Sequence, residues 1–329
     1  MRTIMQTLLR ATIVGLTLAA LHQPAQTQGY PSRAVSFVVP YAAGGTTDTM
    51  ARMLGSKLEK RFGQPFVVEN KPGAASSIGA TYVAKAAPDG HTVLLATSTT
   101  MAINVSIYKK LAYDPTKDLT PVALVAGIPF LLVVNPATPV HSIADLVKLA
   151  KEQKGGLPFG SNGHGGAGHL NMAMLNTMTD TEMTQVPYKG LSPALNDTVA
   201  GHVKVMFGDF STAYPLVKAG KLRAIGVSTR QRVAAAPEIP PLNEAGLPGY
   251  DVSSWQMVVA PGGTPKEIVA KLNAELRALL SEPDIVADFN KRGIIPLVSG
   301  PPEELQAFVK SEVVRWGAVV KKAGAAGVQ

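Results

Sequence analysis

"PYAAGGTTDTMAR", residues 40–52, follows an apolar run and passes at once into a helical pattern. Gly44 and Gly45 leave the backbone of this turn without side chains, and residues 46–48 can cap the helix that follows. Open parallel sheets bind ligands outside the carboxyl ends of their strands, and a helix N-terminus carries partial positive charge. The turn therefore predicts a site for a carboxylate or phosphate. A tight turn without a ligand is the alternative.

Nucleotide binding has no support in this turn. A phosphate-binding P-loop needs a lysine and a hydroxyl residue after its last glycine, and GGTTD has no lysine. The dinucleotide fingerprint G-x-G-x-x-G is absent as well.

A second glycine-rich turn, FGSNGHGGAGHL at residues 159–170, repeats the arrangement after another apolar run and before another helical pattern. Ser161 and Asn162 add polar side chains to its bare backbone. If the two turns belong to different domains, they can face each other across a cleft and hold one small anion. His164 and His169 are five apart, which is unlike an i, i+4 metal pair, so His169 either donates to the ligand or braces the loop.

Length and composition suggest about two domains and exclude several kinds of chemistry. The chain has 329 residues, a formal net charge of +8 and no cysteine, so catalytic thiols, disulfides and cysteine-ligated metals are ruled out. The cations are scattered and no basic stripe alternates with aromatic residues, so we expect no nucleic-acid partner. We also expect no cofactor, no metal and a monomer.

The N-terminus has the layout of a secretory signal peptide. Arg2 and Arg10 precede the apolar stretch ATIVGLTLAAL (residues 11–21), and a polar segment with Pro24 follows. A membrane anchor is the alternative, but this stretch is much shorter than the roughly 20 residues that cross a bilayer. We expect residues 1–29 to be removed by cleavage near residues 25–29, leaving the mature protein in the periplasm.

Short β-branched runs alternate with helical patterns along the chain, which predicts an α/β protein with mostly parallel sheets. Helices are predicted at 264–283 and 301–324, and the proline-rich segment 228–251 reads as a linker or surface excursion. A second, less marked boundary lies at 119–129, where the chain could pass from one sheet to another. The predicted strands are 34–41, 65–70, 92–97, 129–136, 157–161, 203–209, 222–228 and 253–261.

Several of these stretches resemble the extracytoplasmic solute-binding receptors of tripartite tricarboxylate transporters, the Bug receptors. The matching stretches run in order along the expected mature chain: YPSRAVSFVVPYAAGGTTDTMAR, VENKPGAASSIGATYVAKAAPDGHTVLLAT, FGSNGHGGAGHL, VPYKGLSPALNDTVAGHV, KLRAIGVSTRQR, LNEAGLPGYDVSSWQMVVAPGGTP and VVRWGAVVKKAG.

The resemblance implies a two-lobed periplasmic-binding-protein fold, type II-like, with two mostly parallel sheets, flanking helices and a hinge. It implies a first lobe of residues 30–125 and 250–329 and a second lobe of residues 126–249. It implies a receptor without catalysis that closes on a small organic solute, usually a carboxylate, and delivers it to a membrane permease.

Carried over residue by residue, the resemblance implies two sets of ligand contacts. The first lobe would supply Tyr41, Ala43, Gly44, Thr46, Asp48, Thr97, Ser98 and Thr99. The second lobe would supply Ser161, Asn162, Gly165, Gly166, His169, Tyr188, Lys189 and Asp209.

Several alternatives stay open. Similar receptors often carry hydroxyl residues at positions 166–168, where this chain has Gly-Ala-Gly, so Gly166 would offer only its backbone amide. Lys189 can instead be a solvated loop residue, and Asp209 can bind a ligand amine or hydroxyl or cap a local turn. An exported serine hydrolase using Ser161 and His169 is the rival function, although FGSNG does not fit G-x-S-x-G. A third possible function is that of a receptor lobe repurposed as the partner of a sensor protein.

Overall fold

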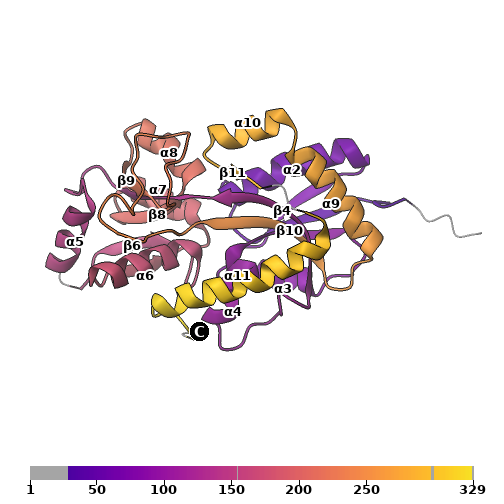
Figure 1. Cartoon of the computed structure of the whole chain (residues 1–329), viewed down its shortest axis with the longest axis horizontal. Helices are drawn as coiled ribbons and strands as arrows, with labels where there is room; N and C mark the ends of the chain where they lie inside the picture. The colour runs from indigo at the N-terminus through magenta and orange to yellow at the C-terminus, as the bar shows by residue number, and fades with distance from the viewer. Residues whose placement is uncertain (1–28, 154, 298–299, 328–329) are drawn as a thin grey trace, which may run out of the picture. The chain divides into compact units, whose positions relative to one another are not determined.

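Two β-sheets, each with helices packed on both faces, organise the chain from Arg33 onward (Figure 1). The computed structural model describes residues 29–153, 155–297 and 300–327, and residues 29–32 contain no helix or strand. The expected signal peptide, apart from Gly29, lies outside the described residues.

The first lobe is the six-stranded sheet and the helices packed on it. Its strand order is β11-β4-β10-β3-β1-β2, and the strands are β1 (Val35–Val39), β2 (Phe66–Asn70), β3 (Thr92–Thr97), β4 (Leu119–Ile128), β10 (Ser254–Pro261) and β11 (Ile295–Pro296). Figure 1 shows one group of helices on one side of this sheet: α2 (Thr46–Phe62), α9 (Lys266–Leu280) and α10 (Pro283–Lys291). The other side carries α3 (Ser77–Ala84), the π-helical turn η1 (Thr99–Ile103), α4 (Asn104–Ile107) and α11 (Pro302–Lys322).

The second lobe is the five-stranded sheet and its helices. Its strand order is β7-β6-β8-β5-β9, and the strands are β5 (Phe130–Val134), β6 (Pro158–Ser161), β7 (Thr184–Pro187), β8 (Val205–Asp209) and β9 (Arg223–Val227). The helices are α5 (Ile143–Glu152), α6 (Ala167–Thr179), α7 (Leu191–Ala200) and α8 (Phe210–Lys218).

Each sheet is mixed, where the sequence predicted mostly parallel pairing. In the first sheet β1 pairs in parallel with β2 and β3, but β10 runs antiparallel to β3 and β4. In the second sheet β6 is parallel to β7 and β8, but β5 is antiparallel to β8 and β9. Because β5 and β10 each enter a lobe from the other lobe, they start at the edge where the parallel strands end. The carboxyl ends of β1, β3, β6 and β8 therefore face the junction of the lobes.

The sequence-based elements largely agree with the structure. All eight predicted strands are present, and the predicted helices at 264–283 and 301–324 correspond to α9 and α11. The passage from one sheet to the other that was expected within 119–129 occurs at its end, at Pro129. The rest of the segment is the long strand β4, whose ladder with β10 is irregular beside Pro121. Proline cannot donate a hydrogen bond to a neighbouring strand, so Pro121 argued against a strand prediction for residues 119–128. Strands β7 and β11 were also missed.

The chain crosses between the lobes at Pro129 and again between β9 and β10. The second crossing contains no helix or regular strand, as predicted for 228–251, but it packs firmly because Leu242 and Tyr250 are fully buried. Tyr250 donates a hydrogen bond to Asn171 of α6 at 2.9 Å. The segment is thus anchored to the second lobe.

A buried carboxylate fastens α11 to the first sheet. Glu312 of α11 accepts hydrogen bonds at Oε2 from the indole nitrogens of Trp255 (2.5 Å) and Trp316 (3.1 Å), the two tryptophans of the chain. Arg315 donates to both oxygens of the same carboxylate, at 2.6 and 2.7 Å. The ion pair and both indole donors therefore meet at one group.

We expect Glu312→Ala to lower the free energy of unfolding by about 2–5 kcal/mol, because it leaves two buried indole donors without their acceptor. Glu312→Gln keeps one side-chain oxygen and should cost clearly less. Urea denaturation followed by circular dichroism measures both. Variants that both unfold within about 0.5 kcal/mol of the wild type would contradict this role, since that is the range of ordinary surface substitutions.

Candidate ligand-binding site

A narrow cavity lies at the junction of the lobes, at the carboxyl ends of β1, β3 and β8. We call it the inner cavity. Its volume is about 40 Å³. One water molecule needs roughly 10–15 Å³, so the cavity holds a few waters. It is lined by Tyr41, Ala42, Gly45, Thr46, Thr47, Thr97, Thr99, Ile128, Phe130, Asn162, Ala167, Gly190, Leu191, Ser192, Asp209, Ser254 and Gln256.

Three helices begin at this cavity, and a glycine precedes each one. Helix α2 starts after Gly45, α6 after Gly166 and α7 after Gly190, and none of these N-cap residues makes a side-chain capping bond. Residues from the first turn of each helix line the cavity. Each helix start adds partial positive charge and free amide donors, so α2 from one lobe and α6 and α7 from the other favour an anion between them.

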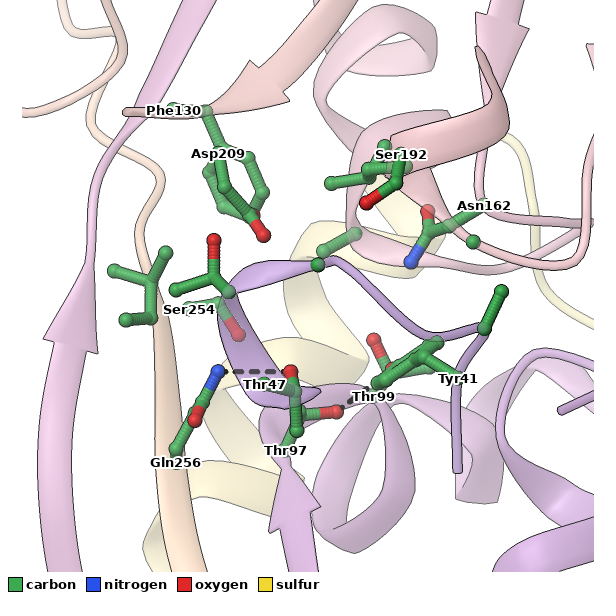
Figure 2. A pocket seen from close by; sticks show the side chains of 17 residues that line it. Tyr41, Thr47, Thr97, Thr99, Phe130, Asn162, Ser192, Asp209, Ser254 and Gln256 are labelled. Atoms are coloured by element: carbon green, nitrogen blue, oxygen red, sulfur yellow. Dashed lines mark hydrogen bonds between the residues drawn. The ribbon is translucent and has the colours of Figure 1, made fainter. Parts of the chain in front are cut away.

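Asn162 presents an amide donor to the cavity. Its Oδ1 accepts a hydrogen bond from Gly168 N at 3.0 Å, which fixes the orientation of the side chain and turns Nδ2 toward the cavity (Figure 2). A Cβ at Gly166 would collide with the Asn162 amide, and a Cβ at Gly168 would come within 2.9 Å of Leu191. The glycines therefore make room for the side chains of Asn162 and of Leu191, the first residue of α7.

Asp48 fixes the first glycine turn without lining the cavity. Its carboxylate accepts hydrogen bonds from Gly44 N (3.0 Å), from Asn70 Nδ2 (3.0 Å) and from two nitrogens of Arg52 (2.9 and 3.1 Å). Burial by itself would raise the pKa of Asp48, but donors from Arg52, Gly44 and Asn70 outweigh it and hold the pKa below its usual range. Gly44 has φ +84°, which glycine adopts without strain.

Hydroxyl and amide groups of the first lobe form the floor of the cavity (Figure 2). Tyr41 Oη and Thr97 Oγ1 lie 2.9 Å apart, and Gln256 Nε2 donates to Thr47 Oγ1 at 2.9 Å. Burial raises the pKa of Tyr41, so its hydroxyl stays neutral. Thr99 Oγ1 and Gln256 Oε1 are buried without a hydrogen-bond partner among the described residues, although buried polar atoms are usually paired.

Asp209 brings a carboxyl into the same space from the end of β8. Figure 2 shows its side chain beside Phe130, pointing into the cavity. Burial raises the pKa of Asp209 to about 6, against an opposing hydrogen bond from the Thr46 hydroxyl. At neutral pH this group is a carboxylate in an otherwise donor-rich site.

A wider pocket of about 760 Å³ adjoins the inner cavity and shares Tyr41, Ala42 and Asn162 with it. We call it the outer pocket. Residues 73–76 from the first lobe and the side chains of Tyr188 and Lys189 from the second line it. Tyr188 donates to Asp197 at 2.7 Å, and Lys189 is exposed. A solute larger than a few waters must extend from the inner cavity into this pocket.

The structure brings together about half of the predicted site residues. The inner cavity is lined by Tyr41, Thr46, Thr97, Thr99, Asn162 and Asp209, and the outer pocket adds Tyr188 and Lys189. The other predicted residues line neither space: Ala43, Gly44, Asp48, Ser98, Ser161, Gly165, Gly166 and His169. Asp48 instead holds the turn at Gly44, Gly166 makes room for the lining Asn162, and Ser98 bonds to the lining Ser254 at 2.7 Å. Contact of any of them with a solute stays a prediction.

Sequence reasoning missed several lining residues. Gly190 and Ser192 carry the same signal as the two recognised turns, a strand followed by glycine and a helix, so the pattern could have included them. Ser254 and Gln256 occupy alternate positions of the fully buried strand β10, which carries no turn or motif. Phe130 enters the cavity only because β5 starts at the crossing, which a sequence pattern does not reveal.

The pair Ser161 and His169 of the rival hydrolase hypothesis has no support. Ser161 is fully buried, and its hydroxyl accepts a hydrogen bond from Gln185 Nε2 at 2.6 Å. His169 Nδ1 accepts from Gly165 N at 3.1 Å, which makes this histidine a brace for its loop. Burial lowers the pKa of His169 to about 4. No hydrogen bond joins Ser161 to His169 in the described residues.

The described part of the chain holds no cluster of three or more His, Asp or Glu side chains suited to a metal ion. Within the same residues, none of the helices is long and apolar enough to cross a membrane.

Two α/β lobes that enclose an amide-lined cavity define the architecture of a solute-binding receptor. Comparison with known proteins agrees. The chain belongs to the tripartite tricarboxylate transporter receptor family, whose model matches residues 50–325. The protein is therefore a solute-binding receptor of this transporter family, and the hydrolase alternative finds no support there.

Individual relatives match the chain almost from end to end. BugT of Bordetella pertussis is 32% identical over 98% of this chain and 98% of its own length. A structure from R. palustris with adipate is 39% identical, covers 90% of this chain and 99% of its own, and has a TM-score of 0.86. MatC from Rhodopseudomonas palustris with bound malate is 37% identical, covers 88% and 100%, and has a TM-score of 0.83. These matches confirm the two-lobed fold and the resemblance to Bug receptors.

We expect Asp209→Asn to stabilise the protein at neutral pH. The pKa of Asp209 is about 6 in the folded protein and near 3.9 when unfolded, so between these values the folded state binds more protons and stability falls as pH rises. The carboxylate thus costs about 3 kcal/mol above pH 6, and the asparagine removes that cost. The gain should shrink toward zero at pH 4.

Urea denaturation of both proteins at pH 4, 5, 6 and 7.5 measures this difference. Asp284 is the matched control, because a hydrogen bond from Lys57 lowers its pKa and Asp284→Asn should change stability in the opposite direction. An Asp209→Asn gain that is the same at every pH, or a loss at pH 7.5, would contradict the raised pKa of Asp209.

We expect Gly166→Ala to weaken solute binding at least tenfold. The backbone of Gly166 suits alanine (φ −62°), but the added Cβ displaces the Asn162 amide and breaks its bond to Gly168. Overpacking of this kind typically costs about 1–3 kcal/mol of stability. In the Asn162→Ala background the clash is gone, so adding Gly166→Ala should cost little more. Calorimetry and thermal melting of the four proteins form the cycle, and additive losses would count against this contact.

Proposed function

We propose that this receptor captures a small carboxylate-containing solute between its lobes and hands it to the membrane permease of its transporter. The observation that carries the proposal is the convergence of three glycine-preceded helix starts, from both lobes, on one cavity. Such ends bind anions through backbone amides and the helix dipole, typically contributing about 0.3–1 kcal/mol each and up to about 2 when partly buried.

The solutes named for two similar structures support the choice of a carboxylate. Adipate and malate are both dicarboxylates, and the proteins bound to them are 39% and 37% identical to this chain. The cavity supplies what a carboxylate needs: amide donors, the neutral hydroxyl of Tyr41 and Asn162 Nδ2. Lys189, exposed in the outer pocket, is available to a second carboxylate of a longer solute.

The mechanism we propose is closure of the lobes around the solute. Thr46 Oγ1 and Ser211 Oγ lie 2.8 Å apart, and Ala42 N donates to Lys189 O at 3.3 Å, so hydrogen bonds join the lobes beside the cavity. A solute drives closure only by binding the closed state better, and contacts from both lobes supply that difference. The hinge would be the two crossings, with lobes of residues 30–125 plus 250–329 and 126–249.

Location, chemistry and assembly complete the proposal. Receptors of this family are periplasmic, and we propose that a signal peptide ending near residues 25–29 is removed on export. The bound solute would leave chemically unchanged, so the receptor is not an enzyme. It would act as a monomer that docks transiently on the permease.

Thermal melting with adipate and malate, each beside its uncharged diamide, tests the carboxylate. We expect saturable shifts of several degrees with the acids, since a ligand at 100 times its Kd adds about 2.7 kcal/mol of stability, and none with the diamides. Thr46→Val and Ser211→Ala should each weaken binding about fivefold, equivalent to one hydrogen bond, and the double variant should lose no more. Equal shifts with acids and diamides, or recovery of altered solute, would reject the function.

A further inference from the structure

Asp209 is a negative group with no cation beside it. Its carboxyl lines the inner cavity, and no lysine, arginine or histidine of the described residues forms a salt bridge with it. Among the described residues, Thr46 is the side chain whose hydroxyl opposes the rise in the pKa of Asp209. A hydroxyl has a single proton to donate and Thr46 also bonds to Ser211, so the carboxylate keeps acceptor sites for a further donor.

The inner cavity therefore has a side that donates hydrogen bonds and a side that accepts them. Asn162 Nδ2 and the starts of α6 and α7 form a side rich in donors, while Asp209 forms a side that only accepts when ionised (Figure 2). The two sides lie across one small space. Tyr41 is the other titratable residue among those lining this cavity, and its hydroxyl is neutral.

An unsubstituted dicarboxylate fits this cavity less well than an acid with a donor group beside its carboxylate. A solute carboxylate held by the helix starts comes close to the Asp209 carboxylate, and like charges within about 4–6 Å repel. A hydroxyl or ammonium next to the solute carboxylate removes the conflict, because it donates to Asp209 while the carboxylate faces the amides. A buried charge is tolerated when it is hydrogen-bonded in this way.

We propose that the solute carries a hydroxyl or ammonium group next to its carboxylate, and that Asp209 accepts a hydrogen bond from this group. The solute class is thus a hydroxy or amino carboxylic acid. This inference rests on the proposed function, and it makes Asp209 the residue that separates such acids from their unsubstituted analogues.

Isothermal titration at pH 7.5 with matched acids tests the proposal. The four-carbon set is succinate, malate and aspartate, and the six-carbon set is adipate, 2-hydroxyadipate and 2-aminoadipate. We expect the hydroxy or the amino acid of at least one set to bind at least tenfold more tightly than the unsubstituted acid.

Substitutions at Asp209 identify the donor. Asp209→Leu removes the acceptor and should abolish the preference for the substituted acid. Asp209→Asn keeps an oxygen acceptor without charge, so a hydroxyl preference should partly survive and an ammonium preference should be lost. Asp284→Asn, an exposed carboxyl on α10, should leave every ratio unchanged. Melting curves verify that each variant is folded.

Two outcomes overturn the inference and are distinguishable. If unsubstituted acids bind as tightly as their hydroxy and amino analogues, or if Asp209→Leu leaves the preference intact, the inference fails while the carboxylate receptor stands. If no acid of either set binds the folded protein, the proposed carboxylate function fails and the inference fails with it.

Discussion

The site depends on backbone amides at the starts of α2, α6 and α7, of which the Gly168 amide already donates to Asn162 Oδ1. No side chain of their N-cap glycines closes these helix ends, and buried amides without acceptors are costly. The glycines keep the backbone bare, Asp48 fixes the first turn and Asn162 fixes the second. The anion site that we propose is therefore built mainly from backbone amides, with Asn162 and Tyr41 as side-chain donors and no arginine in its lining.

The same constraint explains why strand direction matters. The crossing strands β5 and β10 start at the junction and run antiparallel to β8 and β3. The strands β1, β3, β6 and β8 therefore end at the junction, and the helices that follow β1 and β6 start there. Positive helix ends therefore accumulate on one small space. Asp209 places a carboxylate opposite these helix starts, and its raised pKa means that the ionised form destabilises the folded protein. Stability and solute choice are thus coupled at one residue.

Much of the fold and part of the site could be predicted from sequence. Glycine turns after apolar runs marked the starts of α2 and α6, because local composition determines such turns. Asp48 was predicted as a solute contact, but its carboxylate is taken up by Gly44, Arg52 and Asn70, pairings set by tertiary packing. Ser254, Gln256 and Phe130 could not be found, since their position depends on which strands cross between the lobes.

Hydrogen–deuterium exchange of the purified protein, with and without a binding carboxylate, tests whether helix starts of both lobes donate to one solute. Peptides covering residues 44–49, 166–170 and 190–194 should gain protection together, because one solute accepts from amides of both lobes. Peptides from α9, distant from the cavity, should not change. Protection confined to one lobe, or absent from all three helix starts while binding is saturated, would show that the three helix starts do not share one solute.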